Sequence, residues 1–237
     1  MSFVTAQTPR LLVGDYHFSP VLADVTFGAE TEMLDPTTIN DAAKVALPGL
    51  QTGSVSGSGW LDTDGAQNAH LDQLNDWIST DPATWAPSGT TLGAEVLLAN
   101  MLESTFMVGS KVGSVVEWSF SGQQDGPTDL GKSLHALTAE TATAAGTGVD
   151  NGAATANGGV AHLHVTAYSG FTNIIVLVED SVDNAAWTTL VTFSTVTGLT
   201  SQRSTVAAGA TVKRYLRASW TKTGTGSCTF QVGFARR

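Results

Sequence analysis

Charge and cysteine are both scarce in this chain, and each shortage excludes a class of protein. Only 14% of its 237 residues are charged, fewer than most soluble proteins carry. Its single cysteine, Cys228, excludes a disulfide framework within one chain. The longest apolar run, residues 174–178, is too short to span a membrane, and the first residues lack the pattern of a secretory signal. We therefore expect no membrane segment and assembly in the cytoplasm.

Patterns for catalysis and metal binding are also missing. His162 and His164 point the same way on a strand, but a zinc site needs three or four ligands and no other ligand stands at a matching spacing. The acidic turn of Glu179, Asp180 and Asp183 favours side chains that bond their own backbone over a calcium site. No Gly-x-Ser-x-Gly turn leads from a strand into a helix, and no carboxylate pair is marked out as a glycosidase dyad. The sequence therefore predicts no enzyme, no metal and no cofactor.

Glycine, in contrast, is plentiful at 25 residues, and threonine, serine and alanine fill much of the remainder. This composition favours short strands and turns over long helices, so we expect an all-β fold. In the first half, strands are predicted at residues 10–14, 21–27, 51–61, 91–99, 103–109 and 114–121, with a further edge at 130–134. One flanking helix is predicted over residues 65–79, and its core face is Leu71, Leu74, Trp77 and Ile78.

The Gly/Ser-rich strand at residues 51–61 is the centre of the first half. It carries few large side chains, so other backbones can approach it closely, and it buries little surface of its own. It therefore needs neighbours, either in the same chain or in another copy. The residues predicted to pack against such neighbours are Gly53, Val55, Gly57, Gly59 and Trp60.

The order of these elements resembles the tube-forming major tail proteins of long-tailed bacteriophages, over roughly residues 11–134. That family has a β-sandwich or barrel with one flanking helix. The resemblance implies hexameric rings that stack into a tail tube, a conduit for DNA delivery. The matching features are Asp24-Val25-Thr26, a polar excursion, Pro48-Gly49-Leu50, the strand ending in Gly59-Trp60-Leu61-Asp62, and the helix. The excursion is implied to reach the neighbouring ring, through Glu30, Glu32, Asp35, Asp41 and Lys44.

The resemblance also implies a location and partners. The chain is expected in the tail of a virion assembled in the host cytoplasm. Its partners are other copies of itself, a tape measure protein, and tail terminator and tip proteins, with no membrane. DNA is expected to pass through without specific binding. Residues 1–136 carry a net charge of −12 and residues 137–237 carry +2, so an acidic lumen would resist adhesion of DNA. Acidic residues that merely keep the domain soluble explain the charge equally well.

The second half reads as a separate β-sandwich, because strands recur at regular spacing without helices. It resembles the small jelly-roll sandwiches attached to phage tail and virion proteins, through residues such as His162-Leu163-His164-Val165 and Arg214-Tyr215-Leu216-Arg217. The predicted division is a tail tube domain at 1–136, a linker or entry strand at 137–159, and a decoration domain at 160–237. Tyr215 and Arg217 form a possible ligand surface, whereas Trp220 is assigned to the core.

Two other functional classes remain open at this point. A capsid decoration protein would also be acidic and rich in β-strands, but it would bind a shell lattice. A carbohydrate-binding surface module would use the second half to hold a host surface.

Overall fold

The computed structural model describes residues 9–61 and 80–237, and all the regular elements in these ranges are β-strands. The expectation of an all-β fold is therefore confirmed. The helix predicted over residues 65–79, with its core face, lies outside the described residues. No helix in the described ranges is long and apolar enough to cross a membrane.

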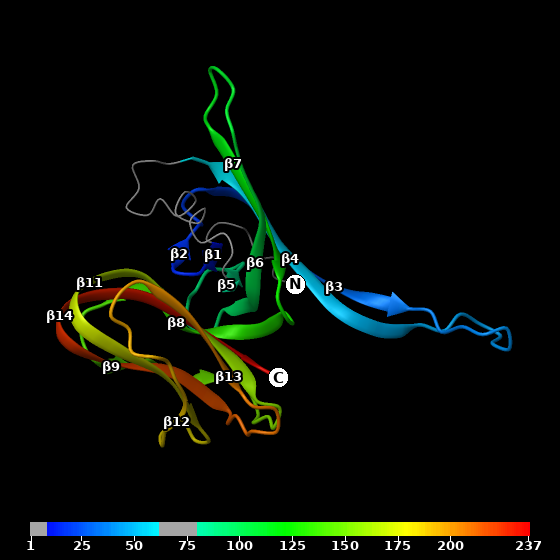
Figure 1. The fold of residues 1–237 in the computed structure, drawn as a ribbon. Helices are drawn as coiled ribbons and strands as arrows, with labels where there is room; N and C mark the ends of the chain where they lie inside the picture. The colour runs from blue at the N-terminus through cyan, green and yellow to red at the C-terminus, as the bar shows by residue number, and fades with distance from the viewer. Residues whose placement is uncertain (1–8, 62–79) are drawn as a thin grey trace.

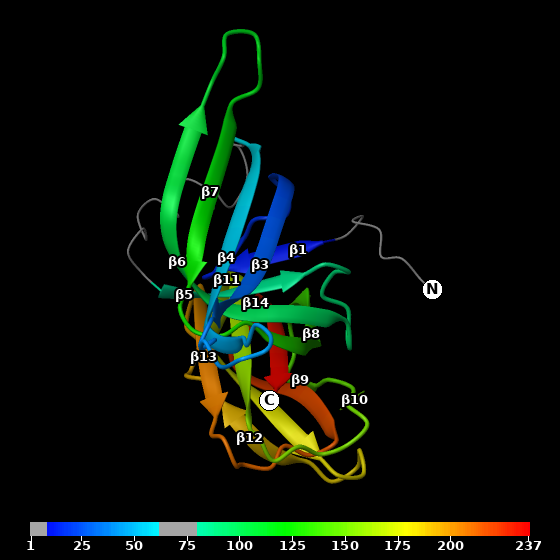
Figure 2. The ribbon, with the colours of Figure 1, turned by 90° about the vertical axis from the view of Figure 1, so that its right-hand side faces the viewer.

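The first half is built around a four-stranded antiparallel sheet in the order β3-β4-β7-β6, whose strands lie side by side in Figure 2. The long strand β6 then pairs with β5, β5 pairs with β1, and β1 pairs with β2. The strands are β1 (Arg10–Val13), β2 (Tyr16–His17), β3 (Leu22–Leu34), β4 (Leu47–Trp60), β5 (Thr80–Ala86), β6 (Glu95–Gly109) and β7 (Glu117–Gln124).

The second half depends on two long strands, β11 and β14, which pair along nearly their whole length. Strands β12 and β13 pair with opposite ends of β11, and the short β9 and β10 pair with β14. Its strands are β8 (Asp129–Glu140), β9 (Ala144–Ala145), β10 (Val149–Asp150), β11 (Gly159–Ser181), β12 (Thr188–Thr192), β13 (Thr200–Val206) and β14 (Tyr215–Arg236).

Strand β8 joins the two halves through backbone pairing. Its first residues pair with Glu95–Leu98 of β6, and the remainder pairs with Phe234–Cys228 of β14. β8 also runs across the expected domain boundary at residue 136. Hydrogen bonding is therefore continuous from one half to the other. The proposed division into domains stays a prediction.

Three apolar clusters lie inside the fold. The first half packs aromatic rings, with Phe18, Trp118 and Phe120 in mutual contact. The second half has a larger cluster between the two layers formed by β11 and β14, and it includes Trp220. A small third cluster lies between the halves, and its members are Ala86, Val96, Leu98, Val160 and Ala235.

Two hairpins project from this body (Figure 1). The β3–β4 hairpin forms an arm that extends far to one side, and the β6–β7 hairpin extends in a different direction. The arm differs from the sequence-based expectation, which ended the strand near Gly28. β3 continues to Leu34 because its outer residues pair in register with β4, as far as Leu34 opposite Leu47.

Several other predicted boundaries were wrong because glycine, proline and polar residues were taken as strand ends. The two strands expected at 91–99 and 103–109 are one strand, β6, which tolerates a bulge between Glu103 and Thr105. β14 likewise runs through Thr223–Gly226, where Gly224 has a φ of 89° and Gly226 a φ of 153°. Pro82, expected in a turn, lies within β5 opposite Asn100.

The close approach at Gly59 makes a direct test of the packing. A Cβ atom there would lie 1.8 Å from the carbonyl oxygen of Val21, which belongs to the backbone and cannot move aside easily. We expect Gly59→Ala to lower the free energy of unfolding by about 3 kcal/mol, the upper end of the usual range for an overpacked site. Urea denaturation measures this change.

Gly28→Ala is the matched control, because its new Cβ would meet only Ser54 Oγ at 3.7 Å, an ordinary contact. It should change the free energy of unfolding by less than about 0.5 kcal/mol. Equal destabilisation by both substitutions would contradict the close approach at Gly59.

Candidate assembly surfaces

One face of the four-stranded sheet is lined by hydroxyl groups. In successive strands Thr26, Ser56, Ser121 and Thr105 stand in one cross-strand row. The next row holds Asp24, Ser58, Ser119 and Met107. Because side chains alternate along a strand, residues two apart share this face, which we call the polar face. All of these side chains are at least partly exposed.

The polar face has no positive charge of its own. None of the four strands β3, β4, β6 and β7 contains a lysine or an arginine. Acidic side chains on this face are Asp24, Glu30 and Glu117, and all three are exposed. A surface of hydroxyls and carboxylates without cations has nothing to neutralise a phosphate backbone.

The opposite face of the same sheet is buried against the core of this chain. Val55 is fully buried, and a Cβ on Gly57 would lie 2.7 Å from the ring of Phe120. Gly53 leaves space for the Gln124 side chain, which crosses it to donate to the carbonyl of Gly28 at 3.2 Å. Thus these predicted packing residues accept neighbours from their own chain, whereas Trp60 is 52% exposed. A role for them between copies stays a prediction.

Within the described residues, the sheet has on each side a long backbone edge without a strand partner. β3 pairs only with β4 among the described strands. At the other side, β5 stops opposite Leu102, so beyond this point β6 pairs with β7 alone in the described ranges. An exposed edge presents unpaired N–H and C=O groups that can pair with another chain.

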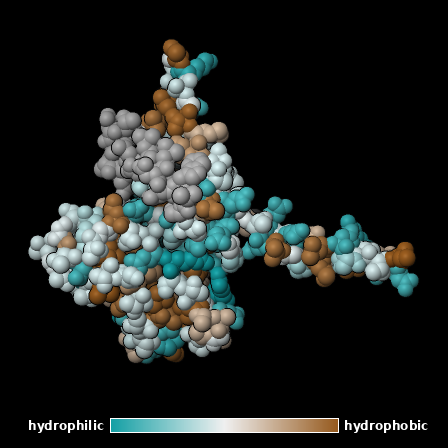
Figure 3. All heavy atoms as spheres, viewed as in Figure 1, coloured by the Kyte–Doolittle hydropathy of each residue, from teal (hydrophilic) through white to brown (hydrophobic). Residues whose placement is uncertain are grey.

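The arm exposes apolar side chains along its length, and Figure 3 shows them in brown. They are Met33, Leu34, Ile39, Val45, Leu47 and Leu50, each at least 40% exposed. Isolated apolar residues on a surface are ordinary, but six on one projecting hairpin indicate a contact surface.

Local polar contacts organise the tip of the arm, where three of the five predicted inter-ring residues lie: Asp35, Asp41 and Lys44. Asp35 accepts hydrogen bonds from the backbone and hydroxyl of Thr37 and forms an ion pair with Lys44 at 3.1 Å. Asp41 accepts from both the backbone N and the hydroxyl of Thr38, at 2.7 and 3.0 Å. Hydrogen bonds from Thr37 and Thr38 hold the pKa values of the two carboxyls below their usual range. The other two predicted residues, Glu30 and Glu32, are exposed on β3 itself.

A hollow of about 500 Å³ lies at the other end of the sheet. Its apolar lining comes from Trp60, Trp118, Met107 and Val108. Met107 and Val108 were not singled out from the sequence. The sequence does contain a pattern that could have identified them, because two adjacent apolar residues end a strand just before a glycine-bounded turn.

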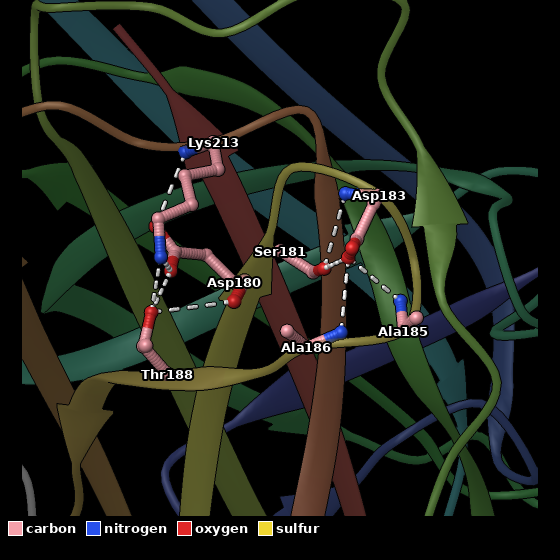
Figure 4. A network of polar contacts seen from close by, with 7 residues as sticks. All are labelled: Asp180, Ser181, Asp183, Ala185, Ala186, Thr188 and Lys213. Atoms are coloured by element: carbon pink, nitrogen blue, oxygen red, sulfur yellow. Dashed lines mark hydrogen bonds and ion pairs between the residues drawn. The ribbon is translucent and has the colours of Figure 1, made fainter.

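The acidic turn of the second half is a structural network and is drawn in Figure 4. The buried Asp180 forms an ion pair with Lys213 at 2.8 Å and accepts from the Thr188 hydroxyl at 2.6 Å. Asp183 accepts from the backbone N of Ala185 and Ala186 and from the Ser181 hydroxyl. These contacts match the expected turn whose side chains bond its own backbone. No group of three candidate metal ligands was found among the described residues.

The predicted ligand surface is already engaged by neighbouring side chains. Arg217 forms an ion pair with Glu179 at 2.8 Å, and its guanidinium lies 4.2 Å from the centre of the Trp187 ring. Arg214 lies over the ring of Tyr215 at 5.0 Å and pairs with Asp150. A ligand at Tyr215 and Arg217 therefore stays a prediction.

Comparison with known proteins gives matches among solved structures. No family model and no curated protein matches the chain. A protein of the virion of a native gene transfer agent is 12% identical, with a TM-score of 0.42, over 51% of this chain and 94% of that one. The SPP1 Dit (gp 19.1) hub protein is 12% identical, with a TM-score of 0.40, over 97% and 99%. The SPP1 tail tube protein is 12% identical, with a TM-score of 0.41, over 52% and 77%.

Asp183 provides a test of the turn network. Hydrogen bonds from Ala186, Ala185 and Ser181 lower its pKa from 3.8 to about 2. A carboxyl with a lowered pKa stabilises the fold above the unfolded value, and this contribution is lost as the pH falls toward 2. We therefore expect Asp183→Ala to lower the melting temperature at pH 7, with a smaller difference from the wild type at pH 3.

Asp183→Asn is the matched control for shape. It keeps an acceptor oxygen but loses the charge, so its melting temperature at pH 7 should lie between those of the wild type and Asp183→Ala. If Asp183→Ala melts like the wild type at pH 7, the network does not stabilise the turn.

Proposed function

We propose that this chain is the structural subunit of a phage-type tail tube, in which copies close into hexameric rings that stack into a conduit for DNA. The observation that carries the proposal is the four-stranded sheet with one cation-free polar face, one buried face and two edges that have no strand partner in the described part of the chain. The six-fold number comes from the resemblance in sequence to major tail proteins.

Ring closure follows from the edges. If the β3 edge of one copy pairs with the β6 edge of the next, each copy adds four strands to a continuous barrel. Closure removes the exposed edges altogether, which is how β-proteins avoid uncontrolled pairing. This pairing joins two different edges, so the contact is head-to-tail. A head-to-tail contact gives a closed ring when repeated rotation from one copy to the next returns to the first copy.

Stacking follows from the apolar surfaces at the two ends of the sheet. The apolar arm extends from one end of β3 and β4, and the hollow at Trp60 lies at the other end. Two different surfaces at opposite ends allow each ring to bind the next in the same direction, so the stack can grow without limit. A tape measure protein and tail terminator and tip proteins would be needed to set its length and ends.

The polar face would line the lumen in this arrangement. Its hydroxyls and carboxylates leave passing DNA without cations to bind, which supports a conduit that does not hold its cargo. The second half would then lie outside the barrel as a decoration domain, because it joins the sheet through β6 and β8.

Electron microscopy of the purified chain over a concentration series tests self-assembly. We expect rings or hollow tubes from the wild type. Ile39, fully exposed at the tip of the arm, should matter for stacking and not for ring closure. Ile39→Asp should therefore yield rings but few or no tubes.

Val182→Asp is the matched control, because Val182 is an exposed apolar residue of the second half. It should assemble like the wild type. Monodisperse single particles at all concentrations would contradict the tube proposal and favour the other two classes. Binding to a capsid shell would then indicate a decoration protein, and binding of the chain to glycans a carbohydrate-binding module.

A second prediction concerns the charge of the lumen. Ser56 and Ser121 are cross-strand partners on the polar face. Tubes with Ser56→Lys and Ser121→Lys should retain a short duplex DNA at low salt and release it at high salt, because lysines replace the counterions of phosphates. Co-sedimentation of labelled DNA with the tubes measures this retention.

Tubes with Thr189→Lys and Thr192→Lys carry the same added charge on exposed positions of β12. These controls should remain close to the wild type. Wild-type tubes that retain DNA as strongly as the Ser56 and Ser121 variant would overturn the assignment of the polar face to the lumen.

A further inference from the structure

A chain of four hydrogen bonds crosses the junction between the two halves. Arg203 Nη1 lies 2.9 Å from His162 Nε2, and His162 Nδ1 lies 3.2 Å from Thr84 Oγ1. Thr84 Oγ1 lies 2.7 Å from His164 Nε2, and His164 Nδ1 lies 2.7 Å from the carbonyl oxygen of Gly14. Gly14 and Thr84 belong to the first half, whereas the two histidines and Arg203 belong to β11 and β13.

The groups at the two ends determine the position of each proton in this series of hydrogen bonds. A carbonyl can only accept, so His164 must donate from Nδ1 and keep Nε2 bare. The Thr84 hydroxyl donates its one proton to that nitrogen and therefore accepts from His162 Nδ1. His162 Nε2 is then bare and accepts from the guanidinium of Arg203, which can only donate. Both imidazoles are neutral, and each bond is satisfied.

No further proton fits into this arrangement. A proton on His162 Nε2 would face the guanidinium N–H, donor against donor and cation against cation. A proton on His164 Nε2 would face the Thr84 hydroxyl, which would lose the acceptor for its own proton. Both histidines are fully buried, so water does not relieve either conflict.

We propose that this chain of hydrogen bonds is a proton-sensitive lock, which holds the second half against the first at neutral pH and opens as the pH falls. Opening would separate β5 from β13 and expose the small apolar cluster at Ala86 and Val160, while β8 stays paired as the hinge. The inference does not depend on assembly into tubes.

The surrounding charges favour this behaviour. Arg203 forms an ion pair with Asp129 at 3.4 Å, and Asp129 is held more tightly by Arg237 at 2.8 Å. Burial lowers the pKa of His164 to about 4, and burial, followed by electrostatic interactions with His164 and Arg203, holds the pKa of His162 well below its usual value. The other titratable groups around the junction are Asp125 near Arg203, Asp15 and Asp81 beside Gly14, and His17 of β2 with Arg10.

The sign and size of the effect follow from these values. In the open state the histidines regain an ordinary pKa near 6.5, so they take up protons that the closed state excludes. Opening is therefore favoured as the pH falls below about 6.5, until the closed state also protonates near 4. Between pH 7.5 and 5.5, each histidine raises the opening equilibrium about tenfold, and the two together about 100-fold.

Thiol labelling measures this opening in the full-length chain. Ala86→Cys places a thiol in the junction cluster, and the native Cys228, buried in the core of the second half, reports global unfolding in the same molecule. Labelling rates are divided by those of a free thiol at the same pH. We expect labelling at position 86 to rise about 100-fold between pH 7.5 and 5.5, and to be faster than labelling of Cys228 at both pH values, because opening of the junction needs no global unfolding.

Variants assign the effect to the two histidines. In the Ala86→Cys background, adding His162→Gln and His164→Gln should remove most of the rise, and His162→Gln alone should leave about tenfold. His135→Gln is the control, because this histidine is buried elsewhere, against Phe230. It should leave the full rise.

Three results would overturn the lock. They are labelling at position 86 that is no faster than labelling of Cys228, no rise at position 86, and a full rise in the histidine variants. Nitrogen NMR gives an independent check at neutral pH, where both rings must carry the proton on Nδ1. A proton on Nε2 of either ring would exclude the ordered chain.

Discussion

Backbone hydrogen bonding is the constraint on which this structure depends. The backbone N–H and C=O groups of each strand need hydrogen-bond partners. In this fold, long strands pair with different neighbours along their length. β6 pairs with β5, β7 and β8, and β14 with β8, β9, β10 and β11. The outer edges of β3 and upper β6 keep no partner within the described residues, and the proposed ring would pair these edges between copies.

Glycine and serine give the two faces of this open sheet different properties. On β4 the glycines fall on the buried face, where Phe120 and the backbone of Val21 approach, and the serines fall on the polar face. The sheet can therefore pack a dense aromatic core on one side without placing large or charged groups on the other. The low charge content of the sequence has the same origin: the four strands contain no lysine or arginine.

The sequence allowed the fold class and the polar strand to be predicted, but not the pairing. Alternation in residues 116–120 identified a half-buried strand, and Trp118 and Phe120 are indeed buried. The strand end at Gly28 and the turn at Pro82 were predicted wrongly, because both residues tolerate a strand when a neighbouring strand supplies the backbone hydrogen bonds. The buried His162 and His164 both hydrogen-bond to Thr84, about eighty residues away in the sequence. No local sequence pattern reveals this contact.

The ion pairs in the structure change the interpretation of the charge difference between the two halves. The second half carries a net charge of +2, in contrast to −12 for the first half. Its basic side chains are used within the chain: Arg214 pairs with Asp150, Arg217 with Glu179 and Lys213 with Asp180. Little cationic surface is then left to attract acidic groups of other copies. The acids of the polar face, in contrast, have no basic neighbour on their own strands, so the proposed assembly relies on backbone edges and apolar surfaces rather than on ion pairs between copies.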